Sequence, residues 1–265
     1  MGQAVRKYKQ RKDTKEQLKI LQDNAKTVLV IHYSCESFYD ITDGRSPRIT
    51  SIGVRNWNSG QTNSFSIHLA AEKQKIKFAE ISKYYDKLEK DMLDAFFDFV
   101  SRNIHCYWIH WNMRDSNYGF AALEHKHRIL EGSPIQIPEE KKFDLSRALV
   151  AIYGISYISH PRLPNLVKLN RITNKDMLSG EEEAQAFNEK EFIKLHQSTL
   201  RKIDILANIL ERTVDKSIKT ETKWYKNISF HPQIIMDIIK NHWGYSAIGA
   251  ILLIAGLYKL IKPLY

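Results

Sequence analysis

The sequence predicts an α/β domain with a mixed sheet flanked by helices, followed by a transmembrane helix near the C-terminus. Two patterns predict the domain: an apolar, β-branched run at 26–33 and a strongly amphipathic helical pattern over 78–103. A third observation predicts the transmembrane helix, because residues 241–258 carry no formal charge. With 43% hydrophobic residues, the 265-residue chain can bury a sizeable core.

The predicted elements run in the order strand, strand, strand, helix, strand, helix and then further helices. A basic helix covers 8–24 and precedes the first strand at 26–33. The next two segments alternate polar and apolar residues, and a turn signal at Asn58-Ser59-Gly60 joins them as antiparallel strands. In chain order, these and the later segments are the strands 48–55 and 62–69, the helix 78–103, the strand 105–111, the helix 118–131, the segment 143–153, the short helix 163–170 and one or two helices over 181–216.

The net charge of +10 is concentrated in two arms. Residues 1–20 carry seven basic and two acidic side chains, and residues 212–262 carry eight basic and three acidic ones. The rest of the chain is therefore neutral, whereas a domain that grips nucleic acid by its phosphates usually concentrates charge on its body. A basic arm next to a membrane segment is attracted to anionic lipid. The alternative is that both arms are solvated helical faces.

The uncharged C-terminal segment has the length and the flanking residues of one membrane span. Its 18 residues extend roughly 27 Å as a helix, close to the thickness of the hydrocarbon layer. The interfacial residues expected at its two ends are Trp243 and Tyr245 on one side and Tyr258 and Lys259 on the other. The alternative is a buried core helix.

Small residues in this segment predict self-association. Gly249 and Gly256 lie near one helical face with Ser246 and Ala250, and small residues on one face permit close approach of helices in lipid. Residues 232–239 form an amphipathic lead-in that can lie at the interface. The expected partners are thus membrane lipid and further copies of the tail.

The expected organisation is a folded cytoplasmic body on a single-pass membrane tail. The start of the chain is polar and basic rather than a secretory signal, and two cysteines with no metal spacing fit a reducing compartment. The predicted parts are a basic N-terminal helix over 1–25, a folded domain over 26–215, a linker with the lead-in over 216–240 and the transmembrane helix over 241–262.

Polar motifs stand at the ends of several predicted elements. The first strand ends in Ser34-Cys35-Glu36, and a later segment reads Phe143-Asp144-Leu145-Ser146-Arg147-Ala148. The strand 105–111 leads into a sequence with His110, Trp111 and Asp115, and a late helix carries His196 and Arg201.

These motifs and the order of elements resemble the RNase H-like fold, and specifically the DEDD 3′–5′ exonucleases of the proofreading type. Those enzymes hold two divalent metal ions with four acidic residues, because Mg²⁺ and Mn²⁺ prefer oxygen ligands. The resemblance covers about 26–210 and implies a metal site at Glu36 and Asp115. It also implies that His196 acts as the base for an attacking water if the chain is active.

Two of the four metal carboxylates of the family are missing from this sequence. Ser34 occupies the position of the first aspartate and Arg201 that of the last, where its positive charge repels a cation. The resemblance therefore implies a non-catalytic member in which Ser34, His110 and Arg201 line a ligand-binding cleft.

Structural roles are the alternative for each of these residues. Glu36 can be a cap or an ion-pair partner, and Asp115 can cap a helix that starts near Ser116. His110 and His196 can be hydrogen-bonded core residues. The cluster at 125–128 is expected on a solvated helix face, and the acidic run at 181–183 in the first turn of a helix.

Three functions follow from these patterns. The first is a membrane-anchored, catalytically inactive sensor or effector, whose body binds a ligand, nucleic acid or a nucleic-acid-bound protein while the tail perturbs the bilayer. Such pairing suits bacterial antiviral defence. The second is an active membrane-tethered exonuclease that uses Mg²⁺ or Mn²⁺, and the third is a tail-anchored structural adaptor without a ligand.

Overall fold

The computed structural model describes residues 3–37, 46–115 and 117–222. The predicted transmembrane helix lies outside these ranges, with its interfacial residues Trp243, Tyr245, Tyr258 and Lys259 and its small residues Gly249 and Gly256. Within the described ranges, no helix combines the length and the apolar character that a membrane crossing requires.

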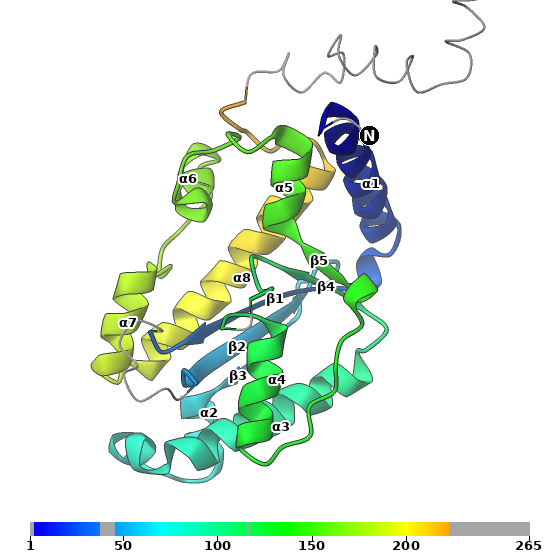
Figure 1. Cartoon of the computed structure of the whole chain (residues 1–265). Helices are drawn as coiled ribbons and strands as arrows, with labels where there is room; N and C mark the ends of the chain where they lie inside the picture. The colour runs from blue at the N-terminus through cyan, green and yellow to red at the C-terminus, as the bar shows by residue number, and fades with distance from the viewer. Residues whose placement is uncertain (1–2, 38–45, 116, 223–265) are drawn as a thin grey trace, which may run out of the picture.

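A mixed five-stranded sheet forms the centre of the molecule (Figure 1). The strands lie in the order β3-β2-β1-β4-β5, with β1, β2 and β3 antiparallel and with β4 and β5 parallel to β1. The prediction of a mixed sheet flanked by helices is confirmed. The strands are β1 (Val28–Cys35), β2 (Ile49–Asn56), β3 (Thr62–Ser66), β4 (Tyr107–His110) and β5 (Lys142–Asp144).

Eight α-helices surround the sheet in the described part of the chain. The longest is α8, which packs along β1 and β2. Three short 3₁₀ segments, Ala25–Thr27, Phe78–Tyr84 and Glu139–Lys141, connect elements. The α-helices are α1 (Gln3–Asp23), α2 (Ile67–Lys73), α3 (Tyr85–Arg102), α4 (Phe120–Ile129), α5 (Leu145–Tyr153), α6 (Arg162–Leu169), α7 (Gly180–Asn188) and α8 (Phe192–Val214).

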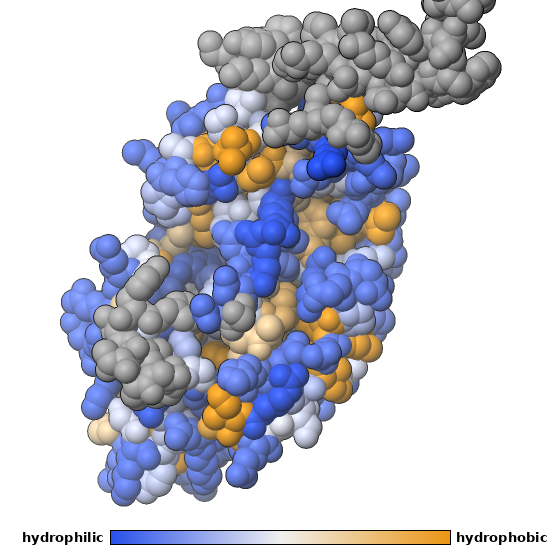
Figure 2. Space-filling view, viewed as in Figure 1, coloured by the Kyte–Doolittle hydropathy of each residue, from blue (hydrophilic) through white to orange (hydrophobic). Residues whose placement is uncertain are grey.

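Two apolar clusters cover the two faces of the sheet because side chains alternate along each strand. In β1, Leu29 and Ile31 belong to the cluster that includes α3, whereas Val28 and Val30 belong to the cluster that includes α5 and most of the apolar side chains of α8. Gly53 of β2 permits the close approach of α8, since a Cβ atom there would lie 3.0 Å from Ile203 Cδ1. Hydrophilic side chains cover most of the outer face seen in Figure 2.

The structure corrects several predicted boundaries. The strand predicted over 62–69 ends at Ser66, where α2 begins, and the helix predicted over 78–103 begins with a 3₁₀ segment. The segment 143–153, to which no type was assigned, contains the end of β5 and the whole of α5. β5 is only three residues long, and such a strand is too short to show an alternating pattern.

Candidate functional site

A pocket of about 590 Å³ opens at the C-terminal end of β1. We call it the β1 pocket. Residues 32–37 form one wall, and the first turn of α7 together with Tyr118 forms the other. A change of register between Ser34 and Cys35 in the pairing with β2 marks an irregularity near the end of the strand. The α7 residues that line the pocket are Gly180, Glu181, Glu183 and Ala184.

The start of α7 directs Glu183 into the molecule. Ser179 and Glu182 form a capping box, in which each side chain accepts a hydrogen bond from the backbone N–H of the other residue. The acidic run at 181–183 lies in the first helical turn, as predicted. The capping box fixes the start of the helix, and Glu183 follows one residue later with its side chain largely buried.

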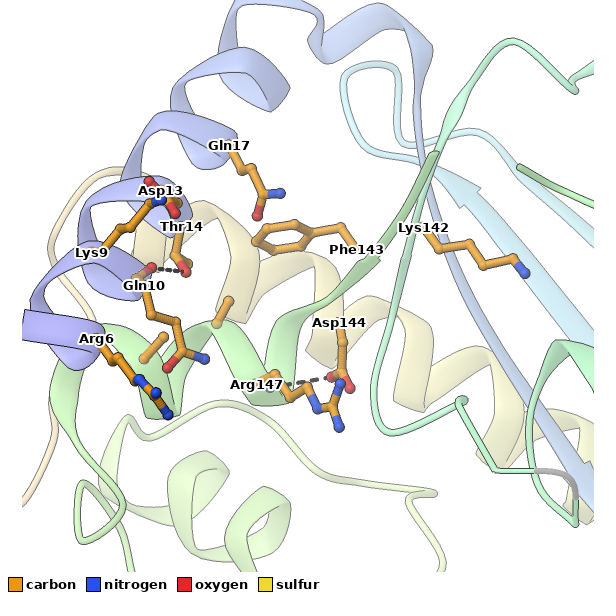
Figure 3. Close-up of a pocket in the computed structure, with 12 residues that line it drawn as sticks. Arg6, Lys9, Gln10, Asp13, Thr14, Gln17, Lys142, Phe143, Asp144 and Arg147 are labelled. Atoms are coloured by element: carbon orange, nitrogen blue, oxygen red, sulfur yellow. Dashed lines mark hydrogen bonds between the residues drawn. The ribbon is translucent and has the colours of Figure 1, made fainter. Parts of the chain in front are cut away.

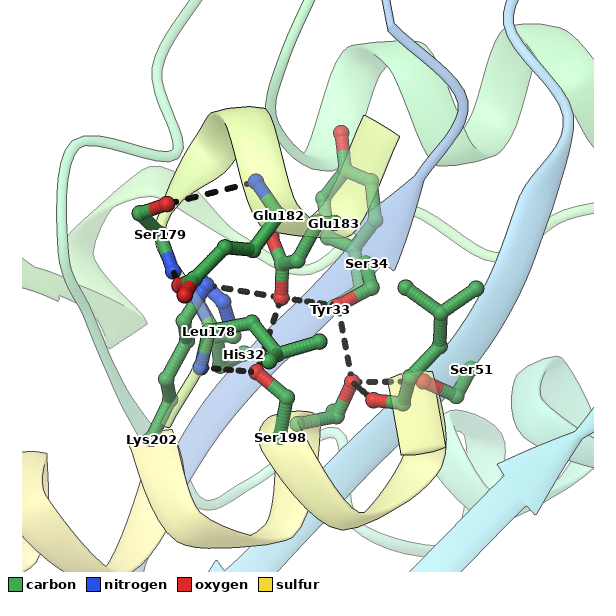
Figure 4. Close-up of polar contacts among 12 residues, drawn as sticks. His32, Tyr33, Ser34, Ser51, Leu178, Ser179, Glu182, Glu183, Ser198 and Lys202 are labelled. Carbon is green, nitrogen blue, oxygen red and sulfur yellow. Dashed lines mark hydrogen bonds and ion pairs between the residues drawn. The ribbon is translucent and has the colours of Figure 1, made fainter. Parts of the chain in front are cut away.

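Glu183 accepts three donors at the base of the pocket. Figure 4 shows the side chains of Ser34, Ser198 and Lys202 converging on it from β1 and α8. The Oγ atoms of Ser34 and Ser198 donate to Glu183 Oε1 at 2.9 and 3.0 Å, and Lys202 Nζ lies 2.7 Å from the same oxygen. Only 9% of the Lys202 side chain and 14% of the Glu183 side chain are exposed, so this is a buried ion pair.

Hydroxyl groups extend this network across the sheet. Thr199 Oγ1 lies 2.9 Å from Ser34 Oγ and 2.5 Å from Ser51 Oγ, and it is also within hydrogen-bond distance of the carbonyl of Leu195. Because a hydroxyl has one proton, Thr199 donates either to the Leu195 carbonyl or to Ser34, and in the second case the chain of donors runs from Ser51 through Thr199 and Ser34 to Glu183. The network therefore ties β1, β2, α7 and α8 together behind the pocket.

His32 and Tyr118 form the other polar part of the pocket. Tyr118 Oη donates to the carbonyl of Tyr33 at 3.0 Å, so the 3.2 Å contact with His32 Nδ1 requires a proton on that nitrogen. His32 Nε2 is then an acceptor, and it has no hydrogen-bond partner among the described residues. Burial, and secondarily the charge of Lys202, lower the pKa of His32 well below its ordinary value, so the ring is neutral.

Glu36 and Cys35 border the pocket without forming a nucleophilic centre. The N–H of Glu36 donates to the Arg48 carbonyl at 2.8 Å, and Glu36 Oε2 accepts from the Arg48 N–H at 3.3 Å. Burial raises the pKa of the Cys35 thiol strongly, and the nearby carboxylates of Glu183 and Glu36 raise it further. The thiol is therefore protonated and not activated as a nucleophile.

A second buried glutamate–lysine pair lies on α3 and α4. Glu89 is fully buried, accepts from Ile49 N–H at 2.6 Å and has Lys126 Nζ at 3.7 Å from its Oε2 atom. Burial raises the pKa of Glu89 to about 7, although Lys126 and the Ile49 N–H oppose this shift. Lys126 also donates to the Ser46 carbonyl at 3.0 Å, so the pair holds the segment that leads into β2.

The structure corrects the solvated helix face predicted for 125–128 at two of its four positions, since His125 and Arg128 are exposed. Lys126 and His127 are only 7% and 2% exposed. His127 Nε2 lies 2.7 Å from Asp94 Oδ1, and its ring stacks on Phe97. The prediction failed at Lys126 and His127 because both side chains reach carboxylates on α3 rather than solvent.

Of the predicted site residues, only Ser34 and Glu36 line the β1 pocket. His110 is 4% exposed, accepts from Met113 N–H at 3.1 Å, and burial lowers its pKa to about 4. His196 packs edge-on against His68 with ring centroids 5.0 Å apart, and burial, with the nearby His68, lowers its pKa to about 4. Arg201 donates from Nε to the carbonyl of Lys175.

Asp115 does not cap a helix, which corrects the structural role considered for it. Helix α4 begins at Phe120 with Gly119 at its N-cap. Asp115 instead accepts the backbone N–H of Asn117 at 2.9 Å and is exposed. Among the described residues, no three His, Cys, Asp or Glu side chains lie together in a way that could hold a metal ion.

Sequence reasoning missed Glu183, Lys202, His32 and Tyr118. One signal for Lys202 was present: Leu195, Ser198, Thr199 and Lys202 recur at helical spacing, which places the last three on a buried face of α8. His32 and Tyr118 carry no comparable signal, since their contact joins residues 86 positions apart.

Comparisons with known proteins provide no relative for this chain. No protein-family model, no curated protein and no solved structure matches it.

Proposed function

We propose that this protein is a membrane-anchored, RNase H-like sensor or effector whose body binds a ligand in the β1 pocket rather than cleaving nucleic acid with metal ions. One observation carries the proposal. The ammonium group of Lys202 lies 2.7 Å from Glu183, which also accepts a hydrogen bond from Ser34. Ser34 is the residue that the resemblance aligns with the first metal-binding aspartate.

The sheet supports the RNase H-like part of the proposal. The resemblance rests on three consecutive strands, a helix and a further strand, and this order recurs in an antiparallel β1–β3 unit followed by the parallel strands β4 and β5. Asp144, in the segment compared with a family motif, caps α5 by accepting from the N–H groups of Ser146 and Arg147. Asp144 therefore has a structural role in this chain as the N-cap of α5.

The electrostatics of the pocket support the non-catalytic part. A divalent ion at Ser34 and Glu183 would approach the Lys202 ammonium in a shielded site, where like charges repel strongly. Glu183 already has three donors, and Ser34 offers a neutral hydroxyl where the family has a carboxylate. In this site the ammonium group of Lys202, rather than a metal ion, stabilises the carboxylate of Glu183.

The pocket itself supports ligand binding. It has the size of a small-molecule site, and its lining includes His32, Tyr118, Glu36 and Glu183. Ligand occupation would be sensed directly by α7, because Glu183 connects that helix to β1 and α8. The proposed output is at the bilayer, through the C-terminal segment.

A nuclease assay tests the non-catalytic proposal. The purified full chain is incubated with single- and double-stranded DNA and RNA in the presence of Mg²⁺ or Mn²⁺, beside its Glu36→Ala variant. We expect no metal-dependent degradation that distinguishes the two proteins. Degradation by the wild-type chain that Glu36→Ala abolishes would establish the active exonuclease instead.

Flotation tests the membrane anchor. The full chain, mixed in detergent with phosphatidylcholine and reconstituted, is expected to float with the vesicles and to resist extraction at alkaline pH. Leu253→Arg places a charge near the centre of the predicted span and should reduce insertion, whereas Leu253→Met should not. A wild-type chain that stays at the bottom of the gradient would remove the anchor from the proposal.

A further inference from the structure

A crevice of about 460 Å³ separates α1 from the segment formed by β5 and α5. We call it the α1–α5 crevice. Figure 3 shows Arg6 and Gln10 on the α1 side and Arg147 on the other side, near Asp144, with the ring of Phe143 pointing toward α1. Helix α1 is held in place by Thr14, Leu18 and Leu21, which are buried.

The cations of this crevice are available for an external anion. Among the described residues, no carboxylate lies within 4.0 Å of the charged groups of Arg6, Lys9 or Arg147, and all three residues are exposed. Of the two carboxylates in the wall, Asp144 is neutralised by Arg114 at 2.8 Å and caps α5. Asp13 alone offsets the three cations.

Lys142 does not add to this set. It extends away from α1 (Figure 3) and pairs with Glu139. The crevice thus combines two guanidinium groups and one ammonium with amide groups of Gln10 and Gln17 over an apolar base. Guanidinium forks with neutral donors beside them match the oxygens of a phosphate ester.

The position of the crevice favours a lipid over other phosphate esters. The last described residues are tied to the end of α5, where Thr222 Oγ1 donates to the carbonyl of Tyr153 at 3.0 Å. Burial, then Arg11 and then Lys216 lower the pKa of Lys15 on α1, so Lys216 lies near that helix. The N-terminal end of α1, the C-terminal end of α5 and the residues before 223 therefore share one end of the molecule (Figure 1).

We infer that the α1–α5 crevice binds the phosphate of an anionic lipid headgroup and so holds the body in a fixed orientation on the membrane. This inference rests on the proposed membrane anchor, because the tail proposed to enter the bilayer begins at this same end. The phosphate would sit between Arg6 and Arg147 with Lys9 beside it, while the apolar base contacts the glycerol carbons.

Calorimetry with short-chain lipids tests the crevice independently of the tail. The full chain in a neutral detergent is titrated with dihexanoyl phosphatidylglycerol and, separately, with dihexanoyl phosphatidylcholine. We expect saturable binding of the anionic lipid only. The variant Arg6→Gln/Lys9→Gln/Arg147→Gln should bind it at least tenfold more weakly, since it loses the charge-assisted hydrogen bonds to phosphate.

A matched control separates the crevice from general attraction. Lys7→Gln/Lys12→Gln/Lys19→Gln removes three charges from exposed positions of α1 outside the crevice. Its affinity should stay within a few-fold of the wild type, and circular dichroism should show equal helix content in both variants. Equal losses in the two variants, or equal binding of the two lipids, would overturn the inference.

A single-stranded oligonucleotide provides the remaining comparison. If it binds more tightly than the lipid and through the same three residues, the crevice is a nucleic-acid site and the lipid inference is wrong. A failed anchor has a different signature, namely absence of flotation with phosphatidylcholine vesicles while the lipid titration is unaffected.

Discussion

The two buried glutamate–lysine pairs of this protein are built differently. Glu183 receives two hydroxyl donors and the Lys202 ammonium at 2.7 Å, whereas Glu89 receives one backbone N–H and has Lys126 at 3.7 Å. Oε2 of Glu89 has no hydrogen-bond partner in the described structure, and the pKa of Glu89 is raised to about 7. Burial is the main cause of this raised pKa, and Lys126 and the Ile49 N–H offset it only in part.

Both pairs influence the end of β1. Glu183, Glu89 and Lys202 all act on the pKa of Cys35, and the Lys126 contact to Ser46 lies two residues before the Arg48 backbone that binds Glu36. The well-satisfied pair thus fixes the base of the β1 pocket. The Glu89–Lys126 pair holds the segment that enters β2, and the carboxyl group of Glu89 changes its charge near neutral pH.

The largest expected effect is the loss of Lys202. Lys202→Met leaves the Glu183 carboxylate buried without its counter-ion, which costs about 4 kcal/mol of the free energy of unfolding. Urea denaturation of the full chain in a neutral detergent, followed by fluorescence of the buried Trp108 and Trp111, measures this cost. Glu183→Gln/Lys202→Met should recover most of it. A single variant as stable as the wild type would contradict the comparison.

The second effect is a pH dependence that belongs to Glu89. Its pKa is higher in the folded state than in the unfolded chain, so its contribution to stability is complete below about pH 4.5 and is lost as the pH rises to about 7. The difference in unfolding free energy between the wild type and Glu89→Gln should therefore fall by about 3 kcal/mol over this interval. A difference that does not vary with pH would mean that Glu89 is ionised throughout.

A smaller effect of opposite sign is expected from His196, which lies on the same helix as Lys202. Its folded-state pKa of about 4 lies below the unfolded value, so its contribution is present above about pH 6.5 and is lost as the pH falls toward 4. The full shift corresponds to about 3 kcal/mol, and because His196 is less deeply buried than Glu89, the wild type should lose on the order of 2 kcal/mol relative to His196→Gln on acidification. A relative gain of stability at low pH would show that the ring is charged in the folded protein.

The strands and helices were largely predictable because their signals are local. β1 was predicted from a continuous apolar run, β2 from an alternating pattern and α3 from an amphipathic helical pattern, and in the structure most residues of both strands are buried. β5 could not be predicted, since three residues become a strand only by pairing with β4. The buried positions of Lys126 and His127 were missed for a related reason, because their partners lie on another helix.

The candidate site was predictable only in part. The motif comparison found Ser34 and Glu36 at the end of β1, and both line the pocket. It placed a positively charged side chain in the site at Arg201, on the late helix. Successive residues on a helix, however, differ by about 100° in direction. The rotation of α8 turns Lys202 toward Glu183 and Arg201 toward Lys175, and only tertiary packing sets that rotation.

The smallest expected effect comes from an exposed lysine of the same helix, and it sharpens the comparison because its ion pair has the same charge separation in an exposed setting. Lys194 Nζ lies 2.7 Å from Glu191 Oε2, the same distance as in the Lys202–Glu183 pair, but its side chain is 52% exposed. Solvent screens this pair and solvates the partner that remains after mutation, so Lys194→Met should leave the urea midpoint unchanged within error. A loss comparable to that of Lys202→Met would mean that the distance between the charges, rather than burial with specific donors, determines the strength of these pairs.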